Sequence, residues 1–109
     1  MNINIEFKMK NAVLYEEVND SLICKFSCNL DDAVVDLFQD ELLNKIQEKH
    51  KTVIFDLEKV SYISYSFLKV AILAARETKA MHIEIIKAKP DIQEVFIKAK
   101  LGRIFKFSV

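Results

Sequence analysis

Residues 53–57 of the chain read VIFDL, a largely apolar run with charged residues beyond each end. A strand without apolar/polar alternation is typical of the centre of a parallel sheet, where both faces are covered. The next stretch, from about Ser66 to Lys79, is apolar nearly all round a helix, which indicates a helix covered on more than one side. Together they predict an α/β protein built around a central strand.

The rest of the chain switches between the two-residue period of strands and the longer period of helices. Extended segments are expected at 3–8, 12–17, 22–28, 81–87 and 103–109, and helices beginning near residues 30, 66 and 90. Pro90 suits the first position of the last helix, and Gly102 suits the C′ position that ends it. The expected order, β-β-β-α-β-α-β-α-β, indicates one domain over residues 1–109: a mixed β-sheet with helices packed on it.

Charge and hydropathy exclude several functional classes. The chain has 16 basic and 16 acidic residues, whereas a nucleic-acid-binding protein is expected to show a basic excess overall or on one face. Its longest nearly uninterrupted apolar stretch, around VAILAA, is far shorter than the roughly 20 residues of a membrane span. MNINIEFKMK lacks the apolar core and cleavage site of a secretory signal. We therefore expect a cytoplasmic protein that neither binds nucleic acid nor inserts into a membrane.

The basic residues near the C-terminus alternate with apolar ones, and they are interpreted as solvated positions of a helix and a strand rather than as a binding patch. They are Lys98, Lys100, Arg103 and Lys106.

No residue pattern indicates catalysis, a cofactor or a metal. A single glycine, Gly102, excludes the GxGxxG and Walker A loops. Neither His50 nor His82 has a cysteine or carboxylate spaced as a nucleophile–base pair. Cys24 and Cys28, four apart in an apparent strand, would lie about 13 Å from each other, too far for a disulfide, and are interpreted as buried small hydrophobic residues. We expect no enzyme activity.

Three segments carry a resemblance to a known family. VIFDLEKVSYISYSFLKVAIL at 53–73 resembles the central segment of STAS domains, the fold of anti-sigma factor antagonists, in which an apolar strand and a loop precede Asp-Ser-Ser-Gly-Leu at a helix start. CNLDDAVVDLFQDEL at 28–42 is similar to the family's Gly-Glu-Leu-Asp segment and the helix after it. KPDIQEVFIKAKLGRIFKF at 89–107 is similar to its closing helix, glycine and last strand. The resemblance runs from about residue 12 to the end.

The chain departs from the family at its regulatory motif. In the family, a kinase that is also the anti-sigma factor phosphorylates the first serine of Asp-Ser-Ser-Gly, and the added charge breaks the complex. Here Ser64 replaces the aspartate, Tyr65 the acceptor serine and Phe67 the glycine, while Ser66 and Leu68 match. We therefore expect the usual switch to be lost. Ser66 or Ser64 remain candidate acceptors, with the alternative for Ser64 that it only caps the helix.

The resemblance implies a non-catalytic partner-switching protein that docks on an ATPase-fold anti-sigma factor/kinase or a related regulator. Exposed aromatic residues are common interface anchors, and the two helix starts are expected at one end of the sheet. The expected docking residues are Asp31, Asp32, Tyr62, Ser64, Tyr65, Ser66, Phe67, Lys69 and Arg76.

Two alternatives stay open. One is an accessory STAS subunit that binds the ATPase of a bacterial ABC lipid transporter, where departures from Asp-Ser-Ser-Gly are usual. The other is a small-molecule-binding or stressosome-like scaffold role.

Overall fold

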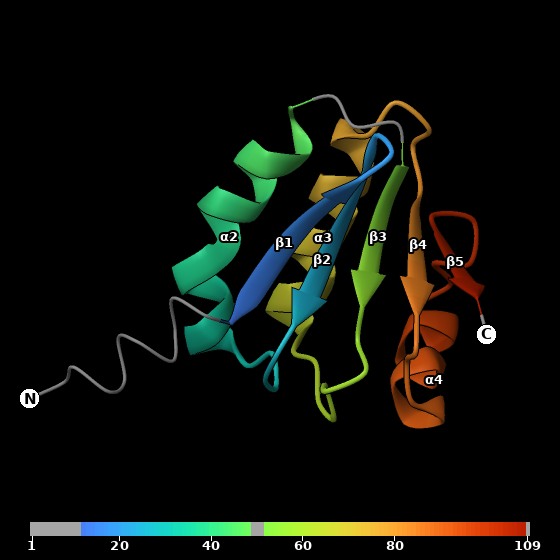
Figure 1. Ribbon diagram of the computed structural model, residues 1–109. Helices are drawn as coiled ribbons and strands as arrows, with labels where there is room; N and C mark the ends of the chain where they lie inside the picture. Colours follow the sequence, from blue (N-terminus) through green and yellow to red (C-terminus); the bar gives the residue numbers. More distant parts are fainter. Residues whose placement is uncertain (1–11, 49–51, 109) are drawn as a thin grey trace, which may run out of the picture.

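The computed structural model describes residues 12–48 and 52–108, which form a five-stranded sheet with helices packed on it (Figure 1). In chain order the elements are β1 (Val13–Val18), β2 (Ser21–Phe26), α2 (Asp32–Ile46), β3 (Thr52–Asp56), α3 (Tyr65–Glu77), β4 (Ile83–Ile86), α4 (Pro90–Lys98) and β5 (Phe105–Ser108). This order confirms the predicted alternation from the strand expected at 12–17 onward. The strand expected at 3–8 and His50 lie outside the described residues.

The strands lie side by side in sequence order, β1-β2-β3-β4-β5. β1 pairs antiparallel with β2 through a tight turn in which Asn19 and Asp20 adopt left-handed φ angles of 49° and 69°, as asparagine and aspartate tolerate in hairpins. β2 to β5 are mutually parallel. The mixed sheet is therefore confirmed, and the carboxyl ends of β2, β3 and β4 lie at one end of it.

All three described helices cover the same face of the sheet. The register places Tyr15, Cys24, Phe55, Ile85 and Phe107 in one row across it, and paired residues share a face. Contacts from each helix reach this face. Lys45 of α2 lies over the Tyr15 ring, Phe67 of α3 packs against Phe55, and Phe96 of α4 packs against Phe107. Within the described ranges, none of the helices has the length and apolar character needed to cross a bilayer.

The opposite face of the sheet is open in the described part of the chain, which corrects one sequence prediction. β3 is central in the strand order, as VIFDL predicted, but it is covered on one side only. Val53 and Phe55 are buried beneath the helices, whereas Ile54, on the other face, is only partly buried. The unbroken apolar run does not distinguish a strand covered on both faces from one covered on a single face, because isoleucine is also favourable on the open face of a strand.

An aromatic cluster forms the centre of the core. Phe26 of β2 has its ring centroid 5.6 Å from that of Phe38, 5.0 Å from Phe55 and 5.3 Å from Phe67. The cluster therefore joins the sheet to α2 and α3 at once. Cys24 is fully buried beside it, as predicted, while Cys28 is only partly buried beyond the end of β2.

The C-terminus of α4 corrects another prediction, because Lys100 rather than Gly102 occupies the C′ position. Lys100 has a left-handed φ of 61° and donates its N–H to Ile97 O at 2.9 Å, and Leu101 donates to Phe96 O at 3.1 Å. These two bonds form a Schellman motif. Gly102 follows two residues later without a positive φ. Lys100 therefore adopts a left-handed backbone conformation that is unfavourable for a residue with a side chain and that glycine adopts freely.

We expect Lys100→Gly to stabilise the fold by about 1 kcal/mol, because glycine removes the cost of the left-handed conformation. Lys98→Gly is the matched control: it makes the same chemical change inside the helix and should destabilise by about 1 kcal/mol. Urea unfolding followed by circular dichroism measures both. Destabilisation by both changes would contradict the assignment of Lys100 to C′.

Candidate functional site

Two loops meet at the carboxyl ends of the central strands. Leu30, after β2, forms an isolated parallel bridge with Ile63, after β3. Leu30 N donates to Tyr62 O at 2.9 Å, and Ser64 N donates to Leu30 O at 2.9 Å. The bridge holds the starts of α2 and α3 next to each other, as the sequence predicted.

Side chains that were not predicted as site residues form hydrogen bonds that hold these loops in place. Asn29 Oδ1 accepts from Ser61 N at 2.7 Å. Lys89, at the start of α4, donates from Nζ to Glu58 O at 2.7 Å and to Val60 O at 3.2 Å. Sequence reasoning missed both residues, since a local pattern does not show which distant loop a side chain reaches.

Ser64 is the N-cap of α3. Its side chain is 4% exposed, and Oγ accepts from Phe67 N at 3.2 Å. The capping interpretation is therefore confirmed. The expectation that Ser64 contacts a partner or accepts a phosphate is wrong for this conformation, because the hydroxyl is buried and engaged by the helix that it starts.

Ser66 connects the first turns of α2 and α3. Its hydroxyl donates to Asp32 Oδ1 at 2.6 Å, and both side chains reach the surface. Asp31, one residue earlier, caps α2 by accepting from Val34 N at 3.0 Å. A phosphoryl group on Ser66 would replace the hydrogen bond to Asp32 and place its negative charge beside that carboxylate.

Two tyrosines project from the same end of the molecule. Tyr62 is 53% exposed and Tyr65, the first residue of α3, is 76% exposed. Lys69, one turn further along α3, has Nζ 5.7 Å from the Tyr65 ring centroid, a cation–π geometry. Both rings are among the exposed large hydrophobic side chains of the described residues. Asp31, Asp32, Tyr62, Tyr65, Ser66 and Lys69 form a candidate docking surface, hereafter called the docking surface.

Phe67 does not belong to the docking surface, which corrects the sequence prediction. Its side chain is completely buried, and its ring lies 5.3 Å from Phe26 and 6.0 Å from Phe55 between centroids. Phe67 begins the buried apolar stripe of α3, which continues through Val70, Ala71 and Ala74, so its side chain faces the sheet. The family's glycine position therefore carries a core residue here.

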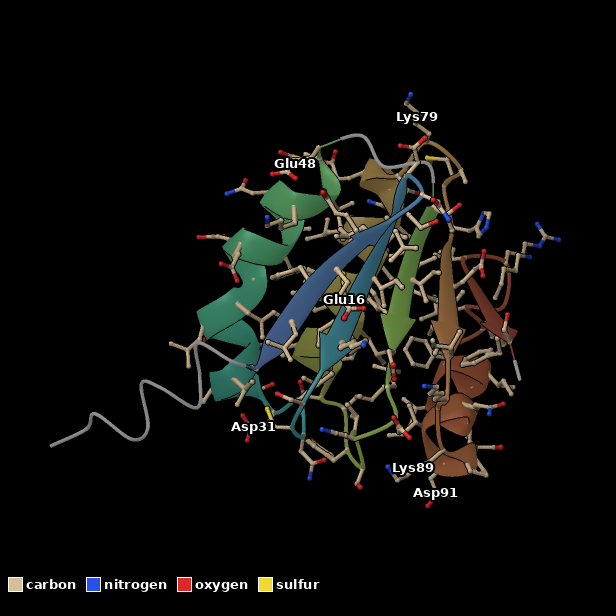
Figure 2. The ribbon with its side chains drawn as sticks, viewed as in Figure 1. Glu16, Asp31, Glu48, Lys79, Lys89 and Asp91 are labelled. Carbon is tan, nitrogen blue, oxygen red and sulfur yellow. The ribbon has the colours of Figure 1, made fainter. Side chains whose placement is uncertain are left out.

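Arg76 is exposed but lies at the other end of α3 from the docking surface. Eleven residues separate it from Tyr65, about 16 Å along a helix. Figure 2 shows the two ends: Asp31, Lys89 and Asp91 lie at one, and Glu48 and Lys79, which follow the helix C-termini, at the other. Arg76 belongs with the second group, so it does not lie beside the other residues expected at the docking surface, and a role for it in docking stays a prediction.

Two observations describe the chemical groups of the structure. Among residues 12–48 and 52–108 there is no group of three or more His, Cys, Asp and Glu side chains placed to hold a metal ion. Burial, and after it the Asp31 carboxylate, raises the pKa of the Cys28 thiol, which disfavours the nucleophilic thiolate.

The sequence model of the STAS domain matches residues 12–109 of the chain. No curated protein sequence matches it. Several solved structures share its fold. The phosphorylated form of the Bacillus cell fate determinant SpoIIAA is 20% identical, with 90% of this chain and 92% of that chain covered and a TM-score of 0.68.

Two further structures are anti-sigma factor antagonists. One, a STAS domain protein from Planctomyces limnophilus, is 16% identical over 88% of this chain and 87% of that chain, with a TM-score of 0.79. The other, from Mycobacterium paratuberculosis, is 14% identical over 87% of this chain and 82% of that chain, with a TM-score of 0.77.

Proposed function

The chain belongs to the STAS domain family, and from this premise we propose that it is a non-catalytic, cytoplasmic regulatory module that docks on an ATPase-fold anti-sigma factor or a related regulator. The contact is made by the docking surface. The observation that carries the proposal is the pairing of two helix starts by the Leu30–Ile63 bridge, with exposed aromatic rings beside them.

The composition of the docking surface suits a protein partner. Tyrosine is enriched among residues that dominate binding energy, because it combines a large apolar ring with a hydroxyl that can hydrogen-bond. Asp31 and Asp32 at the start of α2, and Lys69 over the Tyr65 ring, add exposed charges that can set orientation. Apolar rings together with charged residues are also the two components of known interfaces.

The serine switch of the family is lost in this proposal. Tyr65 stands at the acceptor position, Ser64 is buried as a cap, and the Ser66 hydroxyl is bound to Asp32. A phosphate on Ser66 would meet the carboxylate of Asp32 at the distance of a hydrogen bond. The fraction of this chain that is bound is then set by the concentrations of the chain and of its protein partner, and covalent modification does not control it.

Co-purification of the tagged chain from its native cells tests this function. We expect an ATPase-fold anti-sigma factor among the bound proteins, and an unmodified segment 61–66 in peptide mass spectra of the same sample after incubation with ATP. Recovery of an ABC ATPase with its permease would contradict the proposal and support the transporter alternative. A phosphate on Ser66 or Tyr65 would contradict the loss of the switch.

A further inference from the structure

Charge is strongly segregated in this electrically neutral chain. Residues 31–44 contain five acidic side chains and no basic one, whereas residues 95–108 contain four basic side chains and no acidic one. All nine are exposed to solvent. The acidic ones are Asp31, Asp32, Asp36, Asp40 and Glu41, and the basic ones are Lys98, Lys100, Arg103 and Lys106.

Each charged region includes one exposed large aliphatic residue. Leu37 of α2 is 54% exposed, opposite the buried stripe of Val35, Phe38, Leu42 and Ile46. Asp40 and Glu41, three and four residues later, are its neighbours on the helix surface, and the exposed Asp36 precedes it in the chain. We define the acidic face as these three acids with Leu37.

Ile97 of α4 is 57% exposed, and Lys98 and Lys100 follow it. Glu94, one turn earlier, is the acid next to it on the helix. The basic face is defined as Ile97, Lys98, Lys100 and Arg103. Lys106 is left out because it pairs with Glu84 in the β4–β5 register and points to the open face of the sheet, away from α4. Each face thus combines an apolar contact with charge of one predominant sign.

The two faces lie at opposite edges of the sheet and cannot meet within one molecule. α2 packs over β1 and β2, where Phe38 contacts Phe26 and Lys45 lies over Tyr15. α4 packs over β5, where Phe96 contacts Phe105. Since the strand order is β1-β2-β3-β4-β5, three strands separate β1 from β5, as Figure 1 shows.

We propose that the acidic face binds the basic face of a second copy of this chain, head to tail. The opposite charges steer and orient the two copies, and Leu37 and Ile97 supply the apolar contact. The contact uses two different faces, so each added copy still offers one of them, and the assembly forms open chains or closed rings. The net charge of zero does not prevent this contact, because every copy carries both an acidic face and a basic face.

Sedimentation velocity of the full chain over a range of concentrations tests the proposal. At low ionic strength we expect the average sedimentation coefficient to rise with concentration. In about 1 M NaCl the rise should be lost, because the Debye length shrinks to about 3 Å. A monomer at every concentration in low salt overturns the proposal, as does a dimer that is insensitive to salt.

Charge-reversal variants identify the faces. Asp36→Lys with Asp40→Lys should abolish self-association, and so should Lys98→Glu with Arg103→Glu. An equimolar mixture of the two variants should associate again, since each then carries the complement of the other. The control, Lys59→Glu with Lys79→Glu, has the same net charge as the second variant but changes exposed lysines elsewhere and should still associate. If the mixture stays monomeric, or the control also loses association, the proposed pairing is wrong.

Discussion

Phe67→Asp is expected to unfold the protein. The Phe67 side chain is completely buried between Phe26 and Phe55. Loss of a buried phenylalanine alone costs about 3–5 kcal/mol, and a carboxylate in the same place adds the desolvation of an unpaired charge. Domains of this size are stable by about 5–15 kcal/mol in total. The substitution therefore removes most or all of the stability, and partner binding is lost with the fold.

Thermal unfolding followed by far-ultraviolet circular dichroism measures this effect, and Tyr65→Asp is the matched control. The control introduces the same side chain two residues earlier, at an exposed position in the first turn of α3. An acid there interacts favourably with the helix dipole, so the melting temperature should stay close to that of the wild type. A Phe67→Asp variant that melts within a few degrees of the wild type would show that Phe67 is not a core residue.

Tyr65→Ala is expected to weaken partner binding by at least about 2 kcal/mol, a factor of about 30 in Kd. The ring is the most exposed of the large hydrophobic side chains in the described residues, and nothing in the core depends on it. The unfolding midpoint should therefore stay unchanged. Calorimetric titration with the co-purified partner measures Kd, and chemical unfolding measures the stability of the same preparation.

Two further variants separate the possible causes of that loss. Tyr65→Phe keeps the ring and removes the hydroxyl, so it distinguishes apolar packing from a hydrogen bond. Met81→Ala shortens a comparably exposed side chain at the opposite end of the sheet and should bind as the wild type does. Wild-type affinity in Tyr65→Ala would place the docking surface elsewhere on the molecule.

The elements of the fold were predictable because their signals are local. The α2 stripe at Val35, Phe38, Leu42 and Ile46 is buried as its spacing predicted. The Asn19-Asp20 turn joins β1 to β2 as expected. Each follows from backbone periodicity or turn chemistry, which depend on neighbours a few residues away.

The errors at the site all concern the direction or place of a side chain. Phe67 and Ser64 were expected at the surface and are buried, and Arg76 was expected beside Tyr65 and lies at the far end of α3. A stretch such as SYSFLK contains both polar and aromatic residues, and its local pattern does not show which of them turn inward. That choice depends on where α3 packs against Phe26 and Phe55, which are distant in sequence.

The sequence alone determined the alternation of strands and helices, the mixed sheet and the resemblance to STAS domains, because periodicity and motif spacing are carried by adjacent residues. Only the tertiary structure decided that the described helices share one face of the sheet, that Ser66 meets Asp32, and that the acidic and basic faces lie at opposite edges. These relations join residues on different elements, such as Asp32 and Ser66, which are 34 positions apart. The pairing of strands and the packing of helices bring such residues together or hold them apart.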